Sequence, residues 1–176
     1  MKNLILIAFI GILSACNAQQ KITATKNQNG DLVGIANKES FADDAYKQWF
    51  NANYDNYNAD KVTISQLKRA LKGHTIKGFM GTWCGDSKRE TPRFYRVLDD
   101  ANFDLKNVEM ITVNRSKRTP DNLQEGLNIF KVPTFIFYKN GKEVGRFVER
   151  VRESLEKDML KIVTNKGYKH FYDRSK

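Results

Sequence analysis

The stretch Met80-Gly-Thr-Trp-Cys-Gly-Asp-Ser-Lys-Arg-Glu-Thr-Pro92 joins an apolar segment to a polar one without a linker. The residues that lead into it, Thr75–Gly81, predict a buried strand, and the residues after Cys84 predict a helix. Cys84 is therefore expected directly before a helix N-terminus, where unpaired backbone N–H groups and the helix dipole favour an anion. A thiol in that position has its thiolate form stabilised, and the thiolate is the form that reacts.

A second segment carries the other half of the pattern. Val132-Pro133-Thr134 leads into an apolar run at Phe135–Tyr138, and the turn dipeptide Asn140-Gly141 predicts a β-hairpin with the strand that follows. Pro92 falls inside the predicted helix, which it would kink because proline lacks a backbone donor. Together, the Trp-Cys-x-x-Ser motif, Pro92 and Val-Pro-Thr before a hairpin resemble the thioredoxin family over residues 60–163.

The resemblance implies an α/β protein with a thioredoxin-like fold, in which a central mixed β-sheet is flanked by helices on both faces. The thioredoxin-like domain would span residues 61–165, followed by a basic C-terminal tail at residues 166–176. Residues 21–60 would form an N-terminal extension, made of a β-hairpin around the turn dipeptide Asn29-Gly30 and a helix.

The pattern of apolar residues predicts the other elements. The predicted strands of the N-terminal hairpin are Lys21–Thr25 and Asp31–Ile35, and a buried strand is predicted at Val108–Val113. Further helices are predicted to begin at Ser40, at Thr63, at Thr119-Pro120 and at Ser154. The helix from Thr119 would carry Leu123, Leu127 and Phe130 on one side.

The resemblance also implies which residues line a substrate groove. Pro133 would be a cis proline that faces Cys84 and leaves the backbone of Val132 free to pair with an extended substrate. The other groove residues would be Trp83 as an apolar wall, Gly85 where a partner approaches closely, Asp86 and Thr134.

Two positions depart from the family pattern. Ser87 stands where the family has its second cysteine, which in a dithiol enzyme attacks the mixed disulfide and releases the substrate. Gly78 stands where many thioredoxins carry a buried aspartate that assists proton transfer. Cys84 and Ser87, which can donate a hydrogen bond to the thiolate, therefore predict a monothiol site. Its chemistry would be thiol–disulfide exchange or isomerisation through mixed disulfides with proteins or low-molecular-weight thiols.

The sequence also bears on other functions. The replacement of the second cysteine by Ser87 also fits a non-catalytic thioredoxin-fold module that binds proteins. A metal site is not expected, because His74 and His170 stand alone, without ligand spacing near Cys84, and both are expected at the surface. No oriented histidine partner can be argued for a Cys–His hydrolase, and we expect no cofactor.

The first fifteen residues have the layout of a secretory signal. A charged start is followed by the apolar run Leu4–Leu13, which is too short to remain as a membrane span, and then by small residues. Leu13-Ser14-Ala15-Cys16 resembles the bacterial lipobox, which implies that Cys16 is acylated. Residues 1–15 would then be the signal peptide and residues 16–20 a lipidated tether. The alternative is a plain signal peptide cleaved near Ala18.

The lipobox also bears on location and on the thiols. The protein would be lipid-anchored in the bacterial cell envelope and face the periplasm. Acylation of Cys16 would leave Cys84 as the only free thiol, so no internal disulfide could form. The formal charge of +10 is spread along the chain as on a solvated surface, and no aromatic–basic motif predicts a nucleic-acid partner.

Overall fold

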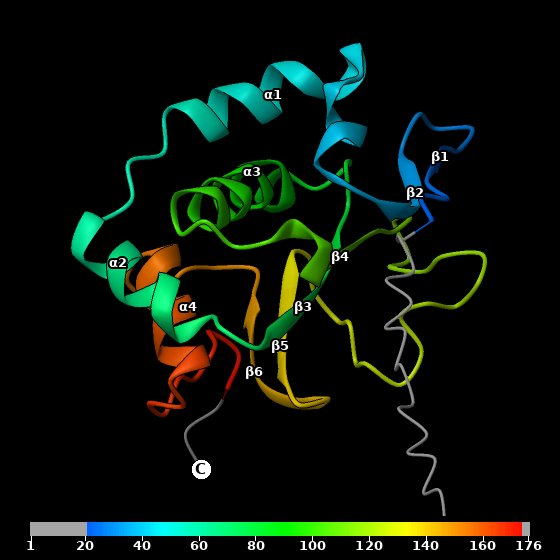
Figure 1. Ribbon diagram of the computed structural model, residues 1–176. Helices are drawn as coiled ribbons and strands as arrows, with labels where there is room; N and C mark the ends of the chain where they lie inside the picture. The colour runs from blue at the N-terminus through cyan, green and yellow to red at the C-terminus, as the bar shows by residue number, and fades with distance from the viewer. Residues whose placement is uncertain (1–20, 174–176) are drawn as a thin grey trace, which may run out of the picture.

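The computed structural model describes residues 21–173, and the predictions made for residues 1–20 lie outside them. A six-stranded mixed sheet with the order β1-β2-β4-β3-β5-β6 forms the centre of the molecule (Figure 1). Its strands are β1 (Thr25–Lys26), β2 (Leu32–Ala36), β3 (His74–Met80), β4 (Val108–Thr112), β5 (Thr134–Lys139) and β6 (Lys142–Val148). The helices are α1 (Asp44–Asp55), α2 (Lys61–Ala70), α3 (Gly85–Asp100) and α4 (Leu155–Val163), with short 3₁₀ helices at Lys38–Ala42 and Leu105–Asn107.

The pairing of the strands gives a βαβ unit followed by a ββα unit. β3 and β4 are parallel and α3 connects them, whereas β5 pairs antiparallel with β3 and with β6 before α4 follows. This order confirms the predicted thioredoxin-like α/β fold. The predicted N-terminal hairpin is also present: β2 pairs with β4, so residues of the extension widen the same sheet.

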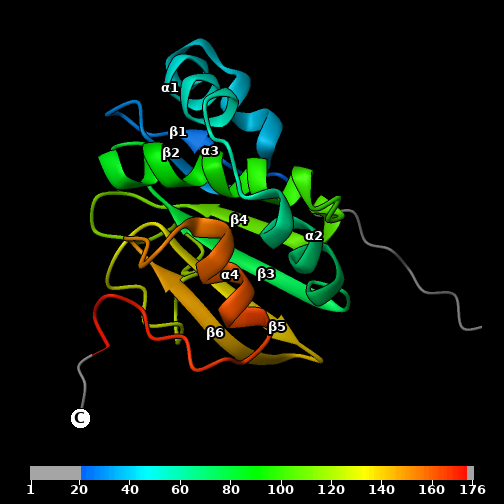
Figure 2. The same cartoon turned by 90° about the vertical axis from the view of Figure 1, so that its left-hand side faces the viewer.

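The two faces of the sheet are covered differently. Side chains of Ile76 and Met80 point from β3 into the main apolar core, which also holds buried residues of all four α-helices. Phe79, on the opposite face of the same strand, packs in a smaller apolar cluster. In Figure 1 the helices lie to the left of the sheet, and the connection between β4 and β5 loops to its right. Figure 2 shows α1 as an outer layer over α3.

The helix predicted from Thr119 to Phe130 is wrong. Residues 119–130 form turns, in which Asn122, Gly126 and Asn128 have left-handed backbone conformations with φ of 51°, 73° and 52°. The hydroxyl of Thr119 accepts a hydrogen bond from the N–H of Leu123, so a side chain satisfies the local backbone in place of a helix. Leu123, Leu127 and Ile129 still pack on the second face of the sheet, which the described residues cover with turns rather than with a helix.

Two helix starts also differ from the prediction. Ser40 lies in a short 3₁₀ helix that Asn37 caps, and α1 begins after Asp43, whose carboxylate accepts from the N–H of Ala45. α2 begins after Asp60, whose carboxylate accepts from the N–H of Thr63. In both cases an aspartate, rather than the predicted Ser40 or Thr63, caps the helix. None of the helices in residues 21–173 is both long and apolar enough to cross a membrane.

Candidate functional site

Cys84 lies at the N-cap of α3, directly after the loop that follows β3. Its backbone is extended (φ −93°, ψ 125°), and its side chain makes no capping hydrogen bond to the helix. The thiol is free and half-buried. The sulfur is thus next to the unpaired N–H groups of a helix start, as predicted, with access from solvent.

The segment before β5 faces this thiol. The Val132–Pro133 peptide bond is cis, and the sulfur of Cys84 lies 3.4 Å from the carbonyl oxygen of Val132. The hydroxyl of Thr134 donates to the carbonyl of Lys131 at 2.7 Å and closes the turn around the proline. The structure therefore brings together Cys84, Val132, Pro133 and Thr134, which are far apart in the sequence.

Trp83 is fixed beside the thiol. Its indole N–H donates to the carbonyl of Val113 at 2.8 Å, and the guanidinium of Arg115 lies 5.8 Å from the ring centre. A Cβ at Gly81 would come within 2.5 Å of the indole, so only glycine allows this ring position. Arg115 also lies 3.7 Å from the carboxylate of Asp31 in the N-terminal hairpin.

Ser87 is fully buried on the first turn of α3. Its hydroxyl accepts a hydrogen bond of 3.2 Å from the N–H of Gly81, which ties the helix start to the end of β3. The hydrogen bond expected from Ser87 to the sulfur of Cys84 is not among those of the described residues, where the thiol donates instead to Val132.

Gly78 is closely surrounded by two apolar side chains. A Cβ at this position would lie 2.8 Å from the terminal carbon of Met110 and 3.3 Å from the ring of Phe135. The place where many thioredoxins carry a proton-transfer aspartate is thus occupied by a methionine and a phenylalanine. Cys84 packs instead against the smaller apolar cluster that contains Phe79 and Val132.

The first residues of α3 differ in their surroundings. Gly85 is exposed, and a Cβ there would meet open space, so a partner can approach the backbone. The carboxylate of Asp86 accepts from the guanidinium of Arg89 at 2.7 Å. This ion pair was not predicted from the sequence. It joins the carboxylate of Asp86 to a guanidinium group one turn further along α3.

The N-terminal extension contributes residues to the site that the sequence analysis missed. The hydroxyl of Thr82, which is buried, accepts a hydrogen bond of 3.0 Å from the N–H of Leu32. β2 therefore holds the residue that precedes Trp83-Cys84. No local pattern could reveal this contact, because fifty positions separate the two residues.

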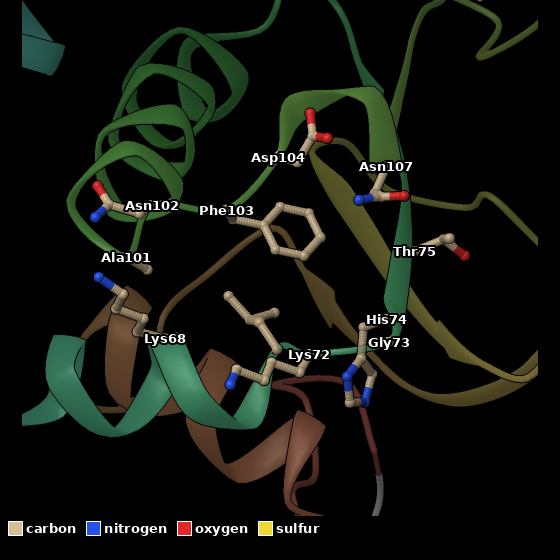
Figure 3. A pocket seen from close by; sticks show the side chains of 11 residues that line it. Lys68, Lys72, Gly73, His74, Thr75, Ala101, Asn102, Phe103, Asp104 and Asn107 are labelled. Atoms are coloured by element: carbon tan, nitrogen blue, oxygen red, sulfur yellow. The ribbon is translucent and has the colours of Figure 1, made fainter. Parts of the chain in front are cut away.

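A separate hollow lies away from Cys84. It has a volume of about 380 Å³ and is lined by Lys68, Lys72, His74, Phe103 and neighbouring residues (Figure 3). His74 begins β3, whereas Cys84 follows the end of that strand, so the hollow is at the other end of the sheet from the thiol. Among residues 21–173, no group of three or more acidic, histidine or cysteine side chains could hold a metal ion.

The surface position predicted for His74 is wrong. Its side chain is buried, because residue 74 shares the inner face of β3 with Ile76 and Met80. Burial and the nearby charge of Lys139 lower the pKa of His74 below its usual range. His170 is half-buried in the C-terminal tail.

Comparisons with known proteins agree with this geometry. A family profile described as Thioredoxin matches residues 58–161. A thioredoxin-like protein of Acanthamoeba polyphaga mimivirus is 32% identical over 103 residues, which cover 56% of this chain and 72% of that protein. Thioredoxin of Gallus gallus is 28% identical over 99 residues, or 56% of this chain and 89% of the avian protein. A crystal structure of a protein of unknown function from Pseudomonas aeruginosa has a similar fold, with a TM-score of 0.50 at 16% identity over 69% of this chain and 83% of that one.

Proposed function

Because this chain belongs to the thioredoxin family, we propose that it is a thiol–disulfide exchange protein that works through the single thiol of Cys84. Family membership supports a thiol–disulfide redox function in general. The observation that supports a single-thiol mechanism is the combination of two features. Cys84 is free and half-buried at a helix N-cap, and the residue at position 87 is a buried serine.

The proposed reaction begins with the thiolate of Cys84. It attacks one sulfur of a substrate disulfide, forms a mixed disulfide with that half of the substrate, and expels the other half as a thiolate. No electrons are gained or lost overall in this exchange. Since Ser87 has no sulfur, the mixed disulfide is released by a thiolate from outside, which re-forms a disulfide with the substrate and returns Cys84 to the thiolate.

An outside thiolate can have two origins. A second cysteine of the same client protein would give isomerisation of its disulfides, and a low-molecular-weight thiol would give net exchange. Here a client is a protein whose cysteine reacts with Cys84. The backbone of Val132 beside the sulfur is the element that would pair with an extended client segment.

The test measures the rate at which Cys84 reacts with a small neutral disulfide. The release of a chromogenic thiol gives this rate at several pH values. We expect faster reaction than for free cysteine at the same pH and a stable mixed disulfide by mass spectrometry. Isolation of disulfide-linked partners from cell envelopes, with Cys84→Ser as the blank, would identify clients. A rate equal to that of free cysteine, with no trapped partners, would refute the exchange function.

That negative outcome would favour the second candidate, a non-catalytic module that binds proteins in the same groove. The supporting observation is the role of Ser87, which links the start of α3 to Gly81 and does not depend on thiol chemistry. Binding of clients that is unchanged in Cys84→Ser would support this candidate.

We also propose that the protein is anchored in the bacterial cell envelope through lipid on Cys16 and faces the periplasm. The support is the sequence Leu13-Ser14-Ala15-Cys16 at the end of a short apolar run. Multiple acyl chains would make such an anchor stable. Mass spectrometry of the mature N-terminus tests this, and an unmodified Cys16 or a chain that begins elsewhere would refute it.

A further inference from the structure

The C-terminal tail packs beside the groove. Residues 166–173 follow α4 and lie beyond the part of the chain that matches the thioredoxin profile. The ring of Tyr172 meets that of Phe130 edge-to-face at 5.6 Å, and the ammonium group of Lys131 lies 5.4 Å from the Tyr172 ring centre. The tail therefore contacts the two residues that immediately precede Val132.

Glu149 joins this tail to the proline segment. Its N–H donates to the carbonyl of Pro133 at 2.8 Å, and its carboxylate accepts from the hydroxyl of Tyr172 and lies 3.3 Å from the ammonium group of Lys131. Glu149 is only 7% exposed, and its φ of 60° is uncommon for a residue other than glycine. A buried carboxylate and a left-handed backbone persist where surrounding contacts hold them, so the tail and the groove form one unit.

The outer side of this unit exposes aromatic and cationic groups. Phe130 and Phe171 are 40% and 49% exposed, and they are two of the four large hydrophobic side chains with high exposure in the described chain. The guanidinium groups of Arg150 and Arg152 lie 5.5 Å and 5.8 Å from the Phe171 ring. We call Phe130, Lys131, Arg150, Arg152 and Phe171 the tail surface.

The two guanidinium groups of the tail surface are available to a partner. Within residues 21–173 the side chain of Arg152 makes no ion pair, and Arg150 has only a distant contact of 3.7 Å with Glu149. A guanidinium group that lies over an aromatic ring keeps the N–H groups in its own plane free, and these can bind a carboxylate. The surface thus combines apolar contact area with carboxylate recognition.

We propose that the tail surface extends the Cys84 groove and binds the client polypeptide next to its reacting cysteine, with a preference for a segment that carries an apolar and an acidic side chain. The proposal rests on the exchange function at Cys84. The position of the surface favours a client as the occupant: Lys131 adjoins Val132, whose carbonyl lies 3.4 Å from the sulfur. An extended chain that pairs with the backbone of Val132 would continue across Phe130 and Phe171.

The test uses short peptides whose single cysteine is linked to 2-thiopyridine as a mixed disulfide. Attack by Cys84 forms a bond to the peptide sulfur and releases pyridine-2-thione, whose absorbance gives the rate. One peptide carries Phe and Glu beside the cysteine, a second carries Phe and Lys, and a third carries only Gly and Ser. Methyl 2-pyridyl disulfide, which has no peptide part, measures the intrinsic reactivity of Cys84.

We expect the Phe–Glu peptide to react about fivefold faster than the Phe–Lys peptide, the size of an exposed charge interaction. Arg152→Gln should reduce this charge preference, because only Arg150 then remains. Phe171→Ser should reduce the advantage of both Phe peptides over the Gly–Ser peptide, because only Phe130 then remains. The matched controls Arg69→Gln and Val62→Ser alter exposed residues of α2 and should change neither rate. Methyl 2-pyridyl disulfide should react equally with all variants.

The two proposals fail in different ways. Equal rates for the three peptides, with methyl 2-pyridyl disulfide still faster than with free cysteine, would overturn the role of the tail surface and leave the exchange function intact. Slow reaction with methyl 2-pyridyl disulfide would overturn the exchange function itself. Binding to phosphatidylglycerol vesicles that is lost in Arg152→Gln and Phe171→Ser, without any peptide preference, would reassign the surface to membranes and overturn the client proposal.

Discussion

The hydroxyl of Ser87 accepts a hydrogen bond of 3.2 Å from the N–H of Gly81, and the side chain is fully buried. The position at which a dithiol thioredoxin has its second cysteine thus fastens the start of α3 to the end of β3. Removal of the hydroxyl leaves a buried N–H without this acceptor, which costs about 1–3 kcal/mol. Ser87 therefore has a structural role that is independent of redox chemistry.

Ser87→Cys should give Cys84 a resolving partner. We expect the oxidised variant to lose both free thiols through an internal disulfide and to gain turnover as a disulfide reductase or oxidase, because release no longer needs an outside thiol. Thiol titration and an insulin-reduction assay measure the two effects. Ser87→Ala is the control, since it also weakens the link to Gly81 but adds no sulfur. Two free thiols after oxidation, with no turnover, would contradict the prediction.

Gly78 and Met110 should be energetically coupled. Gly78→Ala places a Cβ 2.8 Å from the terminal carbon of Met110, so the flexible end of the methionine has to shift, which we expect to cost about 1 kcal/mol. Met110→Ala alone should also destabilise the protein, because it leaves a cavity in the core. In the double variant the new methyl group finds space, so the loss of stability should be smaller than the sum of the losses in the two single variants. Urea unfolding of the four proteins completes this cycle, and strict additivity would show that the two side chains do not meet.

Much of the fold could be predicted because its signals are local. The apolar run at Val108–Val113 and the turn dipeptide Asn140-Gly141 identify β4 and the β5–β6 hairpin within one residue or so of their bounds. The prediction failed at Thr119–Phe130, where leucines at helical spacing outweighed Asn122, Gly126 and Asn128. Those three residues favour left-handed backbone, and they broke the helix while the leucines kept their place in the core.

The reacting residues of the site could also be predicted from the sequence. The contacts that hold them in place could not. Cys84 and Pro133 belong to short motifs with fixed local geometry. By contrast, the contact of Leu32 with Thr82 joins segments that only the folded sheet brings together. The burial of His74 follows from the strand alternation that also buries Ile76, a pattern that the isolation of the histidine in the sequence does not reveal.

Thr82→Val should loosen the loop that carries Cys84. Valine has nearly the shape of threonine but leaves the N–H of Leu32 without an acceptor inside the protein, at a cost of about 1–3 kcal/mol. We expect lower stability and faster alkylation of Cys84, since the residue before Trp83 is no longer held by β2. Thr82→Ser keeps the hydroxyl and should behave nearly as the wild type. Equal alkylation rates in all three proteins would show that the extension does not position the thiol.

Glu156 should make the free energy of unfolding depend on pH at values below the usual pKa of a glutamate. Its carboxylate accepts from the hydroxyl of Tyr57 at 2.5 Å and from the N–H of Asp60 at 3.2 Å, and its side chain is buried. Burial alone would raise the pKa of Glu156, but hydrogen bonds from Tyr57 and backbone N–H groups hold it below its usual value.

The sign follows from this direction. As pH falls, the unfolded chain binds a proton at this carboxyl before the folded protein does, so the stabilisation from Glu156 is complete above about pH 4.3 and is lost below it. Glu156→Gln should lower the free energy of unfolding at pH 7 by about 2 kcal/mol, as expected for hydrogen bonds to a buried charge. The difference from the wild type should shrink as pH falls through the folded-state pKa, because a protonated glutamate and a glutamine are then both neutral.

Denaturant unfolding at pH 7 and in steps below pH 4 measures both effects, and Glu153→Gln serves as the control on the same end of α4. The carboxylate of Glu153 is exposed and pairs with Lys161, so its replacement should change stability little at any of these pH values. A deficit of Glu156→Gln that stays constant as pH falls would mean that the carboxylate charge contributes nothing. The link between Tyr57 and the start of α4 would then rest on packing alone.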